Sequence, residues 1–196
     1  MSRLSRKFKV PDPLANLYDF ANSLDVRHFV HHGMQHREAD ELAGPRELGA
    51  WMSRRGLLWT GAKITPAMFE AALDLRSCVR DYLQRDPADR RRAKDAVGAL
   101  NRTLQLFPLA VEAGHRGVVL RPARSDALAG LSAVVGELYT ASIDGTLGRL
   151  KMCASEECRR VFFDRSKPAT RRWCMSSLCG NRMKTRAYRE RRRALA

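Results

Sequence analysis

Residues 150–194 read LKMCASEECRRVFFDRSKPATRRWCMSSLCGNRMKTRAYRERRRA and contain four of the five cysteines of the chain. The cysteines form two pairs, Cys153-x4-Cys158 and Cys174-x4-Cys179, with fifteen residues between the pairs. Each pair can supply two thiolates from one tight turn, and the intervening chain can bring the turns together, as a tetrahedral Zn²⁺ ion requires. Because four thiolates leave no open coordination position, the sequence predicts one structural zinc ion rather than a catalytic one.

Three other uses of these cysteines compete with zinc binding. Disulfides belong to oxidising compartments, and the basic segment 1–10 lacks the apolar stretch of a secretory signal. Inert buried cysteines would have apolar neighbours, whereas Ser, Glu, Arg and Trp flank these four. Redox-active thiols are the third alternative. With no run of eighteen apolar residues to span a membrane, we expect a cytoplasmic, nucleoid-associated protein with reduced thiols.

The positive charge of the chain is concentrated in its last quarter. The whole sequence has 36 Lys and Arg against 21 Asp and Glu, a net charge of +15. Residues 149–196 contain 15 of the basic and 4 of the acidic residues (+11), whereas residues 1–148 contain 21 and 17 (+4). Such asymmetry predicts a polyanionic partner, with nucleic acid ahead of an anionic membrane surface.

From Met183 onward the sequence predicts a basic helix with cations on two neighbouring faces, because basic residues recur at spacings of three and four. Guanidinium groups bind phosphates or guanine edges, and a tyrosine can pack beside them. Two further arginines precede the third cysteine and could hold a nucleic-acid backbone from the side. The predicted nucleic-acid contacts are Arg171, Arg172, Arg182, Lys184, Arg186, Tyr188, Arg189, Arg192 and Arg193. For Arg182, a salt bridge to Asp164 is an equal alternative.

The local order within residues 149–196 predicts a treble-clef-like finger. We expect Cys153–Cys158 to form a knuckle, residues 160–164 a strand, residues 171–174 its partner, and Cys179 to open the C-terminal helix. A segment this short has few apolar residues, so zinc would supply most of its folding free energy. Its candidate core consists of Phe162, Phe163, Trp173, Met175 and Leu178.

This stretch resembles the CGNR zinc finger family. The resemblance lies in Cys174-MSSL-Cys179-Gly180-Asn181-Arg182-Met183-Lys184, with Arg171-Arg172-Trp173 before it and Tyr188-Arg189-x-Arg191 after it. It implies that the four cysteines are zinc ligands. In that family the finger follows an N-terminal ABATE domain, whose family name describes stress-induced transcription regulators. The loop 166–170 departs from the Asn/Gly-rich form expected there.

The N-terminal part also resembles the ABATE domain. Residues 19–25, Asp-Phe-Ala-Asn-Ser-Leu-Asp, are similar to the Asp-Phe-x-Asn-Thr-Leu signature near its start, and Glu41-Leu42 through Gly56-Leu57 adds to the likeness. Asn22 is unusual for a helix interior. We interpret it as a buried hydrogen-bonding residue, with a place in a ligand pocket as the alternative.

Local signals in residues 1–148 predict five helices and one hairpin. Proline follows a capping or turn residue at Asp12-Pro13, Gly44-Pro45, Thr65-Pro66 and Asp86-Pro87, and each pair predicts a helix start. The first of these helices would bury a stripe from Leu14 to His28, after a mobile arm at 1–10. A β-hairpin is expected at 109–121, with Gly114 and Gly117 bracketing its turn. A last helix would run from Leu128 to near Asp144.

Several residues in this part have two interpretations. His28, His32 and His36 are spaced by four and could chelate a metal, but Gly33 interrupts the pattern, so we expect solvated histidines. Cys78 lies on an apolar stripe and is expected in the core. The run 90–92, Arg-Arg-Arg, is expected on a solvated face, with an extended nucleic-acid footprint as the alternative.

Together these observations predict a mainly α protein: a helical, ABATE-like regulatory domain at 1–148 with a small β-hairpin, and a four-cysteine finger at 149–196. We expect a zinc-dependent DNA-binding transcription regulator, with an effector for the N-terminal domain and a homodimer, since one small module reads few base pairs. RNA or ribosome association is the alternative. An enzyme is not expected, because the sequence lacks a Ser/His/Asp spacing, a phosphate-cradling glycine loop and paired carboxylates on one helix.

Overall fold

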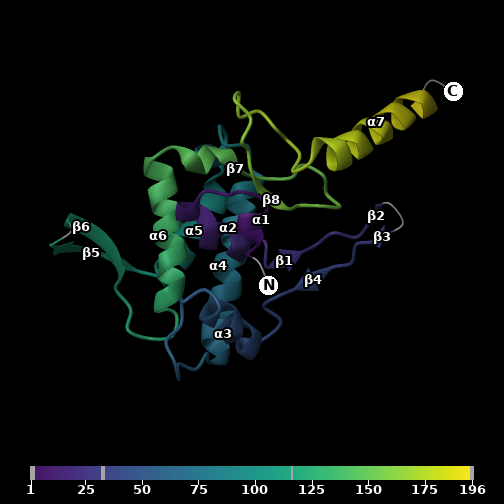
Figure 1. Ribbon diagram of the computed structural model, residues 1–196. Helices are drawn as coiled ribbons and strands as arrows, with labels where there is room; N and C mark the ends of the chain where they lie inside the picture. The colour runs from purple at the N-terminus through teal and green to yellow at the C-terminus, as the bar shows by residue number, and fades with distance from the viewer. Residues whose placement is uncertain (1–2, 32–33, 116, 195–196) are drawn as a thin grey trace.

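The computed structural model describes residues 3–31, 34–115 and 117–194, and it is mainly helical, as predicted (Figure 1). Short 3-10 turns lie at Asp12–Leu14, Arg90–Arg92 and Thr146–Arg149. The helices are α1 (Leu4–Lys7), α2 (Ala15–Ala21), α3 (Pro45–Ser53), α4 (Pro66–Gln84), α5 (Lys94–Leu104), α6 (Ala129–Ile143) and α7 (Asn181–Ala194).

The strands form antiparallel pairs rather than a common sheet. The hairpin of β5 (Leu109–Gly114) and β6 (Gly117–Pro122) confirms the predicted one, with Gly117 at φ +103° where the chain turns. The remaining pairs are β1 (Leu24–Asp25) with β4 (Ala39–Asp40), β2 (Val30–His31) with β3 (Met34–Gln35), and β7 (Leu150–Met152) with β8 (Val161–Phe163).

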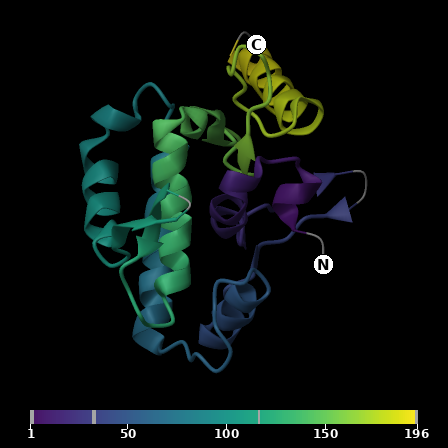
Figure 2. The same ribbon diagram turned by 60° about the vertical axis from the view of Figure 1, so that its left-hand side comes forward.

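The main core lies between α2, α4 and α6, with α3 at one end and the finger at the other (Figure 2). Helix α4 begins as its sequence predicts: the Thr65 hydroxyl accepts a hydrogen bond from the Met68 amide at 3.2 Å, and Pro66 opens the first turn. Its buried face presents Ala72, Leu75, Val79 and Leu83 to the core, and Cys78 packs at the edge of that core, as expected.

The first predicted helix is shorter than its apolar stripe suggests. It ends at Ala21, where the Ser23 hydroxyl donates to the Phe20 carbonyl at 2.8 Å and competes with further helical bonding. Leu24 therefore lies in β1 and His28 is exposed on extended chain, so the predicted stripe is wrong beyond Ala21. The proposed histidine pairs both involve His32, which lies outside the described residues.

The described part of the N-terminal arm, residues 3–10, is docked on the fold, which corrects the expected mobile arm. The backbone amide of Ser5 donates to Asp19 Oδ1 at 2.7 Å and its hydroxyl to Oδ2 at 3.1 Å, and both residues are buried. Arg55 Nη2 lies 3.7 Å from the same carboxylate. The predicted Asp12 cap is also wrong, because α2 begins only at Ala15 and the side chain of Asp12 makes no capping bond.

Arg90 corrects the expected solvated run at 90–92. Its guanidinium is buried and donates to the carbonyls of Leu147 at 2.8 Å and Leu150 at 2.6 Å. Burial lowers its pKa to about 10. Arg90 thus fixes the chain where it enters the finger, whereas Arg91 and Arg92 remain exposed.

Within the described ranges, no helix is long and apolar enough to cross a bilayer.

Candidate metal centre and basic helix

The four predicted cysteines converge on one point. Their Sγ atoms all lie within 4.8 Å of one another, and Cys174 Sγ is 3.6 Å from Cys158 Sγ and 3.7 Å from Cys179 Sγ. A tetrahedral zinc ion with Zn–S bonds of about 2.3 Å requires sulfurs about 3.8 Å apart. None of the four is in a disulfide. The donor set and its spacing therefore fit one structural zinc ion, as predicted.

The electrostatics of the four thiols also call for a cation. Hydrogen bonding with Cys158, and then with Cys174 and Cys179, lowers the pKa of Cys153. Hydrogen bonding with Cys153, and then with Cys158 and Cys179, raises the pKa of Cys174. Neighbouring thiolates repel one another, so the four cannot all ionise without a positive charge among them. A Zn²⁺ ion supplies that charge and would hold all four as thiolates.

Each cysteine is positioned by a short, hydrogen-bonded turn. The Cys153 amide donates to the Arg160 carbonyl at 2.8 Å, which closes the first knuckle, and Cys179 lies in a π-helical turn, Ser176–Gly180, directly before α7. The predicted strand pairing is wrong: β8 pairs with β7, because residues 171–174 are irregular and bond the knuckle through Ala154 N to Arg172 O at 2.9 Å.

The finger core includes a residue that sequence reasoning missed. Phe29, from the N-terminal part, is buried against Cys153, Cys158, Phe162, Leu178 and Cys179, with Trp173 packed at the edge. Of the predicted core, Met175 is exposed instead, and Phe163 packs on the main core. A single phenylalanine within a histidine-rich polar segment was the available signal.

The finger and the helices share packing across residue 148. Leu150, Met152 and Val161 of the finger strands belong to the main core, and Arg80 Nη2 donates to the Arg159 carbonyl at 3.3 Å. Asn22 takes part in the same joint: it is buried, and both ends of its side-chain amide bond the backbone of Val161. The division into two domains at 148/149 therefore stays a prediction, and in the structure residues from both sides of it share one hydrophobic core.

Asp164 organises the loop before the third cysteine. Its side chain is fully buried and accepts hydrogen bonds from Ser166, from the Arg171 amide at 2.8 Å and from Lys151 Nζ at 3.2 Å. Although burial alone would raise its pKa, these bonds lower the pKa to about 2. Asp164 is thus saturated by residues other than Arg182, and the predicted Arg182–Asp164 bridge is wrong.

Two of the predicted nucleic-acid contacts are engaged within the fold. Arg182 forms an ion pair with Glu157, and its guanidinium lies 4.0 Å from the centre of the Phe29 ring. Arg171 Nη2 donates to the Cys174 carbonyl at 2.7 Å. These two arginines hold α7 and the cysteine loop in place, so their direct contribution to a partner is reduced.

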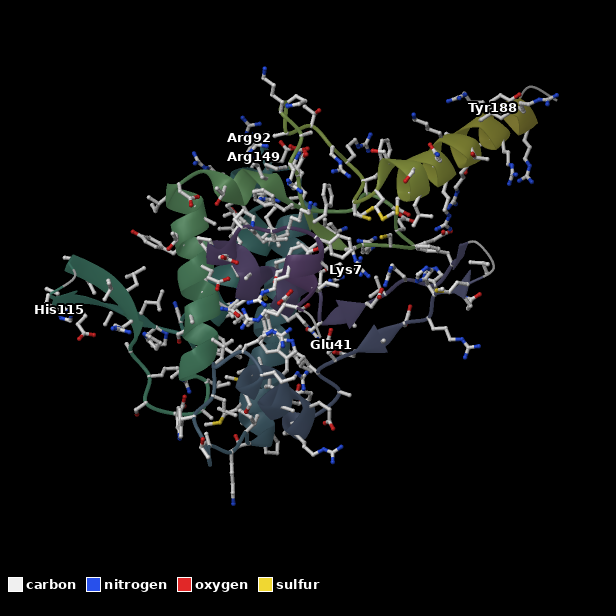
Figure 3. The ribbon with its side chains drawn as sticks, viewed as in Figure 1. Lys7, Glu41, Arg92, His115, Arg149 and Tyr188 are labelled. Carbon is white, nitrogen blue, oxygen red and sulfur yellow. The ribbon has the colours of Figure 1, made fainter. Side chains whose placement is uncertain are left out.

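The other predicted contacts are accessible. Helix α7 projects from the zinc site with no buried residue, and Tyr188 lies on its outer half (Figures 1 and 3). Arg186 Nε is 3.1 Å from Glu190, whereas among the described residues the other exposed cations of α7 have no ion-pair partner. Arg172 is exposed beside Trp173. The unpaired α7 cations are Lys184, Arg189, Arg192, Arg193 and Arg191, which was not among the predicted contacts.

Sequence comparisons agree with this architecture. Residues 149–192 match the family model described as "CGNR zinc finger", and residues 16–148 match the one described as "Putative stress-induced transcription regulator", ABATE. No curated protein matches the chain. Since the ABATE match covers more than half of the sequence and the finger match contains all four clustered cysteines, the chain belongs to the ABATE family and carries a CGNR zinc finger.

Proposed function

We propose that this protein is a transcription regulator that binds duplex DNA through α7, with zinc holding the base of that helix in place. The observation that carries the proposal is the combination of an exposed, cation-rich helix with a four-cysteine cluster at its first turn. Basic helices bound to a rigid base are a recurrent way of presenting guanidinium groups to DNA.

The dimensions of α7 suit the major groove. Its fourteen residues span about 21 Å, and the major groove is about 12 Å wide, enough for a helix with its side chains. Because the helix has no buried residue, it can enter a groove without losing packing in its own fold. Arg191, Arg192 and Arg193 lie in its last turn, where the helix dipole favours cations.

The helical N-terminal part is the regulatory part in this proposal. It is joined to the finger by the bonds of Asn22, Arg80 and Arg90 and by the buried Phe29. A ligand or partner that shifts α2 or α4 would therefore move the zinc site and the base of α7. No reaction is assigned to the chain, and Asn22 serves the joint rather than a ligand pocket.

Competition at fixed salt tests the proposal. A fluorescein-labelled duplex is titrated with zinc-loaded protein, then displaced with unlabelled duplex DNA or with structured RNA. If each of the five unpaired cations of α7 contacts one phosphate, the logarithm of the binding constant should fall with the logarithm of the salt concentration with a slope of about −4.5 on duplex DNA. RNA that displaces the duplex at lower concentration than DNA does would favour the RNA-associated alternative, and a slope near zero would contradict the electrostatic mechanism.

A further inference from the structure

Beside α7 the structure contains a groove that the basic helix does not form alone. It has a volume of about 820 Å³ and is bounded by one face of α7, by the finger turns and by Val30 of strand β2. In Figure 1 the β2–β3 hairpin and α7 both extend toward the same side of the molecule. The lining thus comes mostly from the CGNR finger, and Val30 is the contribution of the ABATE domain.

The charge of the groove is positive after its internal ion pairs are counted. Its four arginines are Arg182, Arg186, Arg189 and Arg193, which share one face of α7. Its two acidic residues, Glu157 and Glu190, are each paired with one of them. Arg189 and Arg193 therefore remain without an acidic partner among the groove residues, and the groove is suited to an anion.

The hairpin beside the groove is packed against the cysteine cluster. Phe29, directly before β2, is buried in the finger core beside the cysteines, and the Arg182 guanidinium packs on its ring. Directly after β3, the centre of the His36 ring lies 4.9 Å from the centre of the Phe29 ring, and the His36 amide donates to the Phe29 carbonyl at 2.9 Å. The hairpin and the base of α7 thus pack against the same core around the four cysteines.

The hairpin presents one exposed apolar side chain to the groove and another away from it. Val30 lines the groove and is 61% exposed, and it pairs with Gln35 across the hairpin. Met34, 66% exposed, belongs to the neighbouring pair of the register and so lies on the opposite face. The chain therefore contains its own control position, equally exposed and one register step away.

We propose that this groove holds the phosphate backbone of one DNA strand, so that the β2–β3 hairpin is a second DNA contact. The inference rests on the proposed function and adds a partner surface to it. A backbone strand separates the major groove from the minor groove of a duplex. With α7 in the major groove, the hairpin lies over the adjacent minor groove, where apolar side chains such as Val30 can contact sugars.

A charge placed at either hairpin position tests the assignment. Val30→Glu puts a carboxylate against the bound phosphates and is expected to weaken binding of a ~20-base-pair duplex about tenfold, whereas Met34→Glu, with the same net charge, stays within about twofold of wild type. Val30→Lys is expected to tighten binding and steepen the salt slope by about 0.9, and Met34→Lys to leave the slope unchanged. Equal effects at the two positions would overturn the proposal.

Two further measurements separate folding and function from this assignment. Zinc content and the thermal midpoint of each variant should equal those of wild type, since both side chains are mostly exposed. Hydroxyl radicals attack sugars from the minor groove, so the footprint of wild type should include protected sugars that Val30→Glu loses. Failure of the wild type to bind duplex DNA would reject the proposed function; binding with unchanged footprints in Val30→Glu would reject only the hairpin contact.

Discussion

The side-chain amide of Asn22 pairs with the backbone of Val161 in both directions. Nδ2 donates to the Val161 carbonyl at 3.0 Å, and Oδ1 accepts from the Val161 amide at 3.0 Å. Asn22 follows the last residue of α2, and Val161 opens β8, so this pairing fixes the ABATE helices to the finger. A third bond, from Nδ2 to the Tyr18 carbonyl at 3.1 Å, holds the amide in this orientation.

Replacing Asn22 should destabilise the whole protein. In Asn22→Ala the buried amide and carbonyl of Val161 lose their partners, and we expect the free energy of unfolding to fall by about 2–4 kcal/mol. Urea denaturation of the zinc-loaded protein measures this loss. The exposed Asn101 of α5 provides the control, since Asn101→Ala should change stability by no more than about 0.5 kcal/mol. Similar losses for both variants would contradict the structural role of Asn22.

Arg182 should affect DNA binding through Glu157 rather than by direct contact. In Arg182→Gln the carboxylate of Glu157 is left unpaired in the groove, and repulsion from phosphate should weaken duplex binding about three- to tenfold. Adding Glu157→Gln should restore most of the affinity. Glu156 is exposed and not part of the groove. The control double variant, Arg182→Gln with Glu156→Gln, therefore has the same net charge as the first double variant but should not recover the affinity. Anisotropy titrations compare the two double variants, and equal recovery in both would reject the mechanism.

Glu137 should make stability depend on pH near neutrality. Burial raises its pKa to about 7, although its carboxylate accepts bonds from the Leu17 amide and Asn16 Nδ2, both at 2.7 Å. The unfolded value is about 4.3, so between these two pH values the folded state binds the extra proton and stability falls as pH rises. After allowance for its partial exposure, we expect the stability of Glu137→Gln relative to wild type to increase by about 2–3 kcal/mol from about pH 5 to about pH 8. Denaturation of both proteins across this range measures the difference, in which the contribution of zinc cancels. A constant difference would show that Glu137 does not titrate in this window.

The features predictable from sequence are those encoded within a few residues. The Thr65 cap and the apolar spacing that follows define α4, the glycines at 114 and 117 define the β5–β6 turn, and the cysteine pairs define the metal site. In each case the physical cause, a cap, a positive φ or a donor set, belongs to the segment itself.

The features that were missed depend on partners distant in sequence. Phe29 belongs to the finger core although more than a hundred residues separate it from Cys153, and Arg90 is buried because the carbonyls of Leu147 and Leu150 converge on it. The β7–β8 pairing likewise replaced the expected partner at 171–174, because β7 is buried against the main core. Local periodicity contains no information on such contacts.

The most direct test of the account is duplex binding by one protein sample before and after zinc is extracted with a chelator and then restored. Metal analysis of the starting sample should give one zinc ion per chain. Because zinc fixes the cysteine turn at the base of α7 and the core around Phe29, extraction should abolish salt-dependent binding of the duplex, and added Zn²⁺ should restore it. Binding by the zinc-free protein with the same affinity and salt slope would contradict the claim that zinc positions α7 for binding to DNA.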